Sequence, residues 1–267
     1  MNPIEKLQAI LQEMDSNKNF YVTNPQKDFT RKRKVSFYDM MWFLLFIGAN
    51  SMSEEIRRAF NDKDFSYISE AAILKSRNKI KSVAFEQLFH KFNATLEKEQ
   101  EYKGYRIIAI DGSDFSSCYS ADSEYATISN QYGGANRMHI NFAYDILNKI
   151  FLDCVIEAKN KADERKGAVK MLSSLAESEK ILAIMDRGFD GLKMIEHCNR
   201  IENLSYLIRV RSTKMNEIAA LPNKELDLDL KFEVRTQSKR LPYKMKIQAW
   251  DFALHRFLQT GKGQAQG

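Results

Sequence analysis

Two short apolar runs, each ending on an aspartate, constrain this chain more than any other feature. Residues 107–110 read Ile-Ile-Ala-Ile before Asp111, and residues 181–185 read Ile-Leu-Ala-Ile-Met before Asp186. Central strands of a sheet are continuous apolar runs of this kind, and an acid at the strand end combines a rigid backbone with a solvent-accessible side chain. The pattern predicts a buried sheet that presents two carboxylates, a set of ligands suited to a divalent cation.

Each aspartate also has a simpler interpretation. A glycine follows Asp111 directly and follows Asp186 two positions later, and an acid next to glycine after a strand is an ordinary turn signal. In that case the carboxylate would only bind its own backbone. The repetition of the pattern, with strand and helix patterns between the two copies, favours a shared site.

Composition limits the class of protein. The chain has 267 residues, of which 44% are hydrophobic and 28% charged, as in ordinary globular proteins. Its 41 Lys and Arg against 35 Asp and Glu leave a net charge of +6, which favours polyanionic partners. Three unpaired, widely spaced cysteines indicate neither a disulfide framework nor a zinc site.

The same survey predicts a cytoplasmic protein with no membrane partner. The longest apolar stretch, residues 38–48, is shorter than the roughly 20 residues that a spanning helix needs and contains Asp39. The N-terminal residues lack the basic-then-apolar order of a secretion signal.

The hydrophobic period changes near residue 105. Residues 1–100 have helical spacing throughout, which predicts an all-helical N-terminal domain. A catalytic domain is expected over 101–212, with strands at 106–112, 138–146, 150–158, 180–186 and 204–210 and helices at 163–178 and 190–201. This order predicts the α/β class, a mixed sheet with crossover helices. Residues 213–267 are expected to begin a strand-rich insertion, with short strands at 226–234 and 243–247, and to end in an irregular tail from Gly261.

Four strings in this order resemble the DDE transposases of bacterial insertion sequences, of the IS-four type. They are Ala-Ile-Asp-Gly-Ser at 109–113, His-Ile-Asn-Phe-Ala-Tyr-Asp-Ile-Leu-Asn-Lys at 139–149, Asn-Lys-Ala-Asp-Glu-Arg at 160–165 and Met-Asp-Arg-Gly-Phe-Asp at 185–190. The resemblance covers about residues 25–245. It implies a ribonuclease H-like catalytic domain that cleaves DNA at element ends and transfers the freed strand.

The resemblance also assigns roles to the two aspartates. Asp111 and Asp186 match two of the three catalytic, metal-binding acids of the family, with Asp111 as the bridging ligand, and the cofactor would be Mg²⁺ or Mn²⁺ in a two-metal arrangement. The partners implied are double-stranded DNA, as terminal repeats and as target, and a second copy or a full-length transposase. Nucleoid association would follow from DNA binding.

The third acid of the family, a glutamate in a Tyr-x-x-Arg-x-x-x-Glu pattern, has no match. Tyr206 and Arg209 are followed by Thr213 at the required position, and Tyr243 leads only to Lys246. We therefore expect a truncated, frameshifted or split copy that is inactive, because loss of one ligand from a catalytic site costs orders of magnitude in rate.

Four other residues near these strings have two interpretations each. Asp114 is either an outer-shell acid or a surface charge. Glu164 opens a helix, where an acid is favourable whatever the function. His139, a single histidine in a strand, is more often structural than catalytic, and Glu157 is a weak substitute for the missing acid.

Basic residues form the candidate DNA-binding surface. They are Arg31, Lys32, Arg33, Lys34, Arg77, Lys79 and Arg187. Such residues supply the sequence-independent phosphate contacts, and residues 69–80 would form a recognition helix. The alternatives are a solvated basic face and, for Arg187, an ion pair with the neighbouring acid.

Two further functions stay open at this stage. A ribonuclease H-like nuclease without transposition would cut plain duplexes or RNA–DNA hybrids. A catalytically dead DNA-binding protein would occupy element ends or inhibit a full-length transposase.

Overall fold

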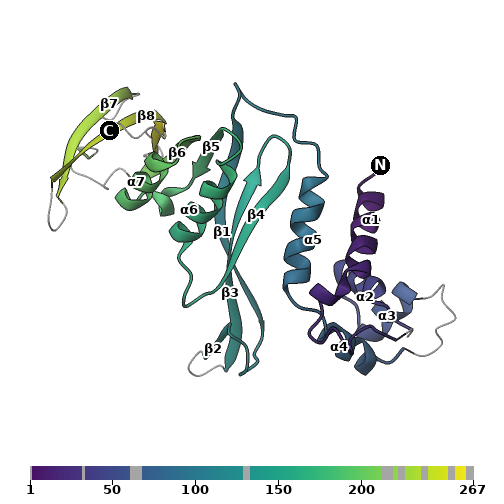
Figure 1. Cartoon of the computed structure of the whole chain (residues 1–267). Helices are drawn as coiled ribbons and strands as arrows, with labels where there is room; N and C mark the ends of the chain where they lie inside the picture. The colour runs from purple at the N-terminus through teal and green to yellow at the C-terminus, as the bar shows by residue number, and fades with distance from the viewer. Residues whose placement is uncertain are drawn as a thin grey trace. The chain divides into compact units, whose positions relative to one another are not determined.

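The computed structural model describes residues 2–31, 34–60, 68–128, 133–211, 219–221, 226–235, 240–251 and 256–262. The chain divides into two compact units, Met1–Glu97 and Lys98–Gly267. Figure 1 labels the helices and strands of both units. None of the described helices is both long and apolar enough to cross a bilayer.

The described part of the first unit is mostly helical. Its elements are α1 (Pro3–Ser16), a short 3₁₀ helix η1 (Lys18–Phe20), α2 (Phe37–Phe46), α3 (Met52–Phe60), α4 (Glu70–Arg77) and α5 (Val83–Ala94). Asn2 and Ser36 begin α1 and α2 with capping boxes. In each, the side chain of the first residue accepts a hydrogen bond from the backbone N–H three residues on, and the acidic side chain at that later position accepts one from the backbone N–H of the first residue. One apolar cluster joins α1, α2 and α5, and a second joins α2, α3 and α4.

The second unit is built on a mixed sheet. Its strands are β1 (Arg106–Cys118), β2 (Ala126–Ile128), β3 (Gly134–Asp145), β4 (Ile150–Ala158), β5 (Ile181–Met185), β6 (Leu204–Arg211), β7 (Leu226–Arg235), β8 (Arg240–Asp251) and β9 (Arg256–Lys262). The neighbours run in the order β2-β3-β1-β5-β6-β9-β8-β7. β4 also pairs with β3, along the side of β3 that faces away from β1. β5 lies parallel to β1 and to β6, whereas β3 lies antiparallel to β1.

Two crossover helices cover one face of this sheet. α6 (Glu164–Leu175) connects β4 to β5, and α7 (Leu192–Arg200) connects β5 to β6 through the short 3₁₀ helix η3 (Arg187–Phe189). Their apolar sides pack on alternate strand residues in one buried cluster that includes Ile108, Ile110, Met171, Ile195 and Tyr206. The predicted α/β class, a ribonuclease H-like mixed sheet preceded by a helical region, is confirmed.

The turn between β3 and β4 is where the sequence predicts it. Asp145 accepts hydrogen bonds from the backbone nitrogens of Leu147 and Asn148 at 3.1 and 3.0 Å, and Lys149 takes a left-handed φ of 58°. An aspartate that binds the backbone two residues on is a local turn signal. Residues 145–149 therefore carry a local signal for this hairpin.

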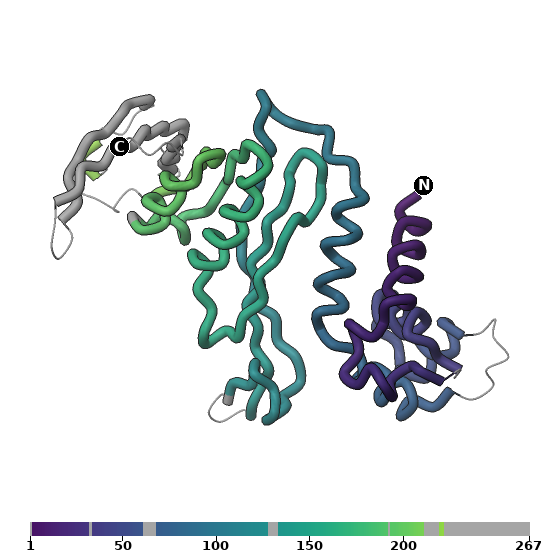
Figure 2. The backbone as a smooth tube through the Cα atoms, in the orientation of Figure 1, coloured from purple at the N-terminus to yellow at the C-terminus, as the bar shows by residue number. Residues whose placement is uncertain are grey.

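Several strand boundaries differ from the predictions, among them those of β8, which covers Arg240–Asp251 where the pattern predicts a strand at 243–247. β1 continues six residues past Gly112 because β3 begins at Gly134, four residues earlier than expected, and pairs with it as far as Cys118. Figure 2 lets the reader follow this long pair of strands. β9 includes Gly261 and Lys262 and pairs with β6, so the irregular tail is wrong for those two residues; residues 263–267 lie outside the described part.

The three cysteines, Cys118, Cys154 and Cys198, are free. Cys198 lies in the core on α7, and burial raises the pKa of its thiol to about 12. A buried thiol held in its protonated form is a poor nucleophile.

Candidate active site

The two predicted acids are brought together by the pairing of their strands. The last residues of the parallel β1–β5 ladder are Ile110 and Met185, so that Asp111 and Asp186 each take the next position on neighbouring strands. Both side chains are exposed. Parallel pairing thus places two carboxylates at one edge of the β1–β5 ladder, as the sequence pattern predicts.

The two carboxylates bind nearby backbone in different ways. Oδ1 of Asp186 accepts from the backbone nitrogen of Gly188 at 2.6 Å and caps η3. Oδ1 of Asp111 accepts from the nitrogen of Gly112 at 2.9 Å, but β1 continues through this point. The turn interpretation therefore holds for Asp186 and fails for Asp111.

The alternation of β1 separates Asp111 from Asp114. Asp111 lies opposite Phe142, whereas Asp114 lies opposite His139, and opposite residues of an antiparallel pair share a face. Ile108 and Ile110 face the helices, so His139 and Asp114 are on that covered face and Asp111 is on the other. Asp114 is therefore not an outer-shell partner of Asp111, although the two are close in sequence.

Asp114 instead belongs to a polar network around His139. The imidazole is 3% exposed; its Nδ1 lies 2.7 Å from Asp114 Oδ1 and its Nε2 lies 3.2 Å from Glu164 Oε1. Lys159 Nζ lies 2.7 Å from Asp114, and Lys159 and His139 together hold the pKa of that carboxyl below its usual range. The network ties β1, β3 and α6 together on the face of the sheet opposite Asp111.

Gly112 is required by this close packing, not by a turn. A Cβ at residue 112 would lie 2.6 Å from His139 Nε2 and 2.8 Å from Asn141 Oδ1, and both of these side chains are buried. Gly112→Ala should therefore lower the free energy of unfolding by about 1–3 kcal/mol, the usual cost of overpacking. Urea denaturation would measure it, with Ser113→Ala at the next, exposed position as control; equal losses in the two variants would contradict the assignment.

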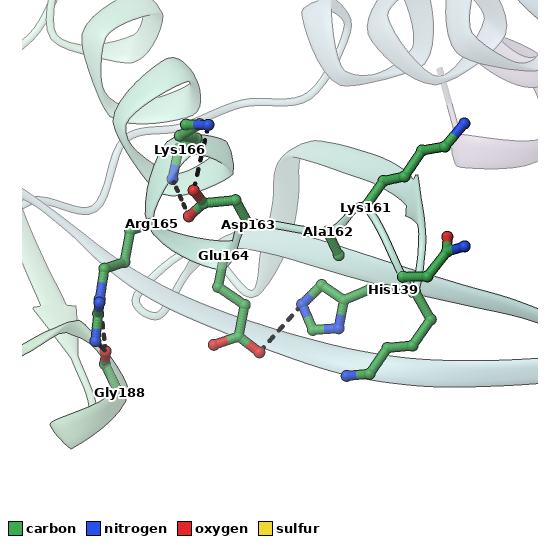
Figure 3. A pocket seen from close by; sticks show the side chains of 10 residues that line it. His139, Lys161, Ala162, Asp163, Glu164, Arg165, Lys166 and Gly188 are labelled. Atoms are coloured by element: carbon green, nitrogen blue, oxygen red, sulfur yellow. Dashed lines mark hydrogen bonds and ion pairs between the residues drawn. The ribbon is translucent and has the colours of Figure 1, made fainter.

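A pocket lies between His139, the start of α6 and Gly188, the residue whose backbone nitrogen donates to Asp186 (Figure 3). It has a volume of about 460 Å³ and is lined by His139, by residues 159–166 and by Gly188. The guanidinium of Arg165 donates two hydrogen bonds to the carbonyl of Gly188, from Nε at 3.0 Å and from Nη2 at 2.8 Å. The string at 160–165 supplies two basic residues of this lining, Lys161 and Arg165, and Lys159 and Lys166 flank it. The sequence pattern gives none of these four cations a site role.

A third acid for the pair is not found. Within the described ranges, no three His, Cys, Asp or Glu side chains are grouped so that they could hold a metal ion. Glu157 lies opposite His139, on the face away from Asp111, and its Oε2 accepts from the nitrogen of Asp163 at 3.3 Å. It is therefore badly placed as the substitute considered above.

Arg187 follows Asp186 and its side chain is exposed. In the part of the chain that the structure describes, no acid forms an ion pair with it. The described part of the chain therefore does not support the ion pair between Arg187 and the neighbouring acid. The contact of Arg187 with DNA stays a prediction.

In the helical unit, two of the predicted DNA-binding residues meet. Arg31 and Lys79 line a pocket of about 210 Å³ together with Lys18 and Phe29, and Lys79 Nζ lies 5.5 Å above the Phe29 ring. The predicted recognition helix is shorter than expected: α4 ends at Arg77, and Lys79 lies in the turn beyond it. Lys34 is exposed, and Lys32 and Arg33 lie outside the described residues.

Comparison with known proteins finds a matching family and similar solved structures. The model of the transposase DDE domain family matches residues 102–256. Among solved structures, the fold is similar to that in the cryo-EM structure of a piggyBac transposase synaptic complex with hairpin DNA, at a TM-score of 0.50 and 10% sequence identity. That alignment covers 100% of this chain and 62% of the other, and at this identity it shows the fold alone. No curated protein matches the chain.

Proposed function

The chain belongs to the transposase DDE domain family, and from that premise we propose that it is the transposase, of the IS-four type, of a bacterial insertion sequence. The observation that carries the proposal is the adjacent placement of Asp111 and Asp186 at the end of the β1–β5 ladder. Two exposed carboxylates held side by side by paired strands can supply part of the ligand set that metal-dependent phosphoryl transfer uses.

The two aspartates fit a divalent cation by the chemistry of their oxygens. Mg²⁺ prefers one or two carboxylates together with water and substrate phosphate oxygens. Each Asp Oδ1 is held by a backbone nitrogen, which fixes the side chain and leaves Oδ2 as the candidate ligand atom. When bound, Mg²⁺ or Mn²⁺ would supply charge neutralisation and activation of the attacking water or 3′-hydroxyl.

Double-stranded DNA is the proposed partner, bound through backbone phosphates. Support comes from the net charge of +6 and from the exposed Arg31, Lys34, Arg77 and Arg187, with Lys79 beside Arg31. Lys32 and Arg33 join this set on sequence grounds only. Such contacts give sequence-independent, salt-dependent affinity, so terminal-repeat recognition needs base contacts in addition. A cytoplasmic location with nucleoid association, and assembly with a second copy or a full-length transposase, complete the proposal.

For residues 1–267 taken alone, we propose DNA binding without cleavage. Two observations support it: the family's Tyr-x-x-Arg-x-x-x-Glu pattern has no match in the sequence, and no third acid joins Asp111 and Asp186 within the described ranges. The same observations favour the second candidate function, an inactive DNA-binding protein that occupies element ends or inhibits an active transposase.

The purified chain should shift duplex DNA carrying the ends of its own element and leave both strands intact in Mg²⁺ or Mn²⁺. The physical reason is that a catalytic site short of one ligand loses orders of magnitude in rate. Mobility-shift gels measure binding, and denaturing gels with end-labelled strands measure cleavage. Cleavage by the wild-type chain that disappears in the Asp111→Asn, Asp186→Asn double variant would overturn the inactive assignment and would strengthen the transposase one.

A further inference from the structure

The pocket beside Gly188 carries more positive than negative charge. Its lining includes four cations, Lys159, Lys161, Arg165 and Lys166, against two acids, Asp163 and Glu164. Its described lining has no Phe, Tyr, Trp or large aliphatic side chain, and the imidazole of His139 is buried. A concave site of this composition suits an anion and offers nothing on which a base could stack.

The two acids are already engaged. Asp163 caps α6, with its Oδ1 accepting from the nitrogen of Lys166 at 3.2 Å, and the pKa of Asp163 is lowered chiefly by backbone hydrogen bonding there. Glu164 Oε1 lies 3.2 Å from His139 Nε2. Lys159 is paired with Asp114. Lys161, by contrast, is exposed and has no acid partner in the part of the chain that the structure describes.

The pocket adjoins the aspartate pair through one loop. The guanidinium of Arg165 donates to the carbonyl oxygen of Gly188, and the backbone nitrogen of Gly188 donates to Asp186. Glu164 Oε2 and Asp186 Oδ1 both approach one point, the place where a Cβ on Gly188 would lie, at 3.8 and 2.9 Å. An anion in the pocket would therefore be a near neighbour of whatever Asp186 binds.

We propose that this pocket binds a backbone phosphate of the DNA strand, a neighbour of the phosphate that lies at Asp111 and Asp186, with Lys161 as its principal cation. The proposal rests on the proposed function, since it takes DNA to be the substrate. Arg165 both shapes the pocket and fixes the loop that follows Asp186. Because phosphates are common to every sequence, the pocket positions the strand in register and does not read bases.

The test compares two lysine variants of the full chain. Lys161→Gln removes the exposed lysine of the pocket that pairs with no acid among the described residues. Lys149→Gln removes an exposed lysine in the β3–β4 turn, which is outside the pocket lining. The probe is a fluorescein-labelled 40-bp duplex of arbitrary sequence, titrated at several salt concentrations. Lys161→Gln should weaken binding roughly fivefold to tenfold at 0.1 M salt and reduce the salt-dependence slope by about 0.9, the value for one phosphate contact. Lys161→Arg should restore both.

A second measurement localises the contact. Saturating duplex should protect Lys161 from acetylation by an amine-reactive reagent and leave Lys149 reactive, as read by mass spectrometry. If the wild-type chain binds the duplex but Lys161→Gln behaves like Lys149→Gln and Lys161 stays reactive, the pocket proposal is overturned and the proposed function stands. If the wild-type chain binds neither this duplex nor element-end DNA, both fall.

Discussion

Replacing Arg106 with methionine should lower the free energy of unfolding of the second unit by about 3–5 kcal/mol. Arg106 Nη1 lies 2.8 Å from Asp145 Oδ2, and the two side chains are 5% and 0% exposed. Burial opposes the charge on Arg106, but its hydrogen bonds to Glu179 and Asp145 outweigh burial and raise the pKa of Arg106 above its ordinary value. Methionine would leave Asp145 as a buried charge without its cation. Removing one partner of a buried ion pair destabilises a protein more than removing both.

Hydrogen exchange of peptides from β1 and β5, followed by mass spectrometry across a urea series, reports on this unit separately from the helical one. Arg137→Met is the matched control, because Arg137 is exposed on β3 and should change stability by no more than about 0.5 kcal/mol. A double variant, Arg106→Met with Asp145→Leu, should recover part of the loss since it removes both charges. Losses of similar size for Arg106→Met and Arg137→Met would show that the pair is not buried in solution.

The sheet could be predicted from local pattern because its central strands are buried on alternate residues and flanked by turn signals. The apolar runs before Asp111 and Asp186 and the hairpin at 145–149 are of this kind. The extension of β1 to Cys118 could not, because residues 113–118 are largely exposed and polar and are held in the sheet by pairing with β3. Such pairing depends on a strand that is distant in the sequence, and the hydrophobic period of one strand gives no information about its partner.

The candidate site divides in the same way. The placement of Asp111 next to Asp186 follows from parallel pairing of two recognisable strands. The separation of Asp111 from Asp114 follows only from the alternation of a strand that was expected to end at residue 112. The pocket was missed because its cations are grouped by a loop between β4 and α6, and in sequence they look like an ordinary charged helix start.

Removing both carboxylates of the pair should abolish binding of divalent metal without unfolding the chain. In Asp111→Asn, Asp186→Asn, the amide oxygens can still accept from Gly112 and Gly188, and both side chains are exposed, so the local structure should persist. Loss of a residue that only supports a metal ligand can weaken metal binding by up to about 100-fold. Loss of the two ligands themselves should therefore weaken Mn²⁺ binding by at least about 100-fold. Isothermal titration with Mn²⁺ and no DNA measures this directly and does not depend on catalytic activity.

The same variant separates a metal site from two unrelated surface acids. At an Mn²⁺ concentration a hundred times the dissociation constant, the metal should stabilise the wild-type chain by about 2.7 kcal/mol and the double variant hardly at all. Asp122→Asn, at an exposed turn between β1 and β2, should keep the full effect. Equal stabilisation of all three proteins would mean that Mn²⁺ binds elsewhere. Asp111 and Asp186 would then be neighbours because their strands pair, and the inference from sheet edge to phosphoryl-transfer chemistry would fail.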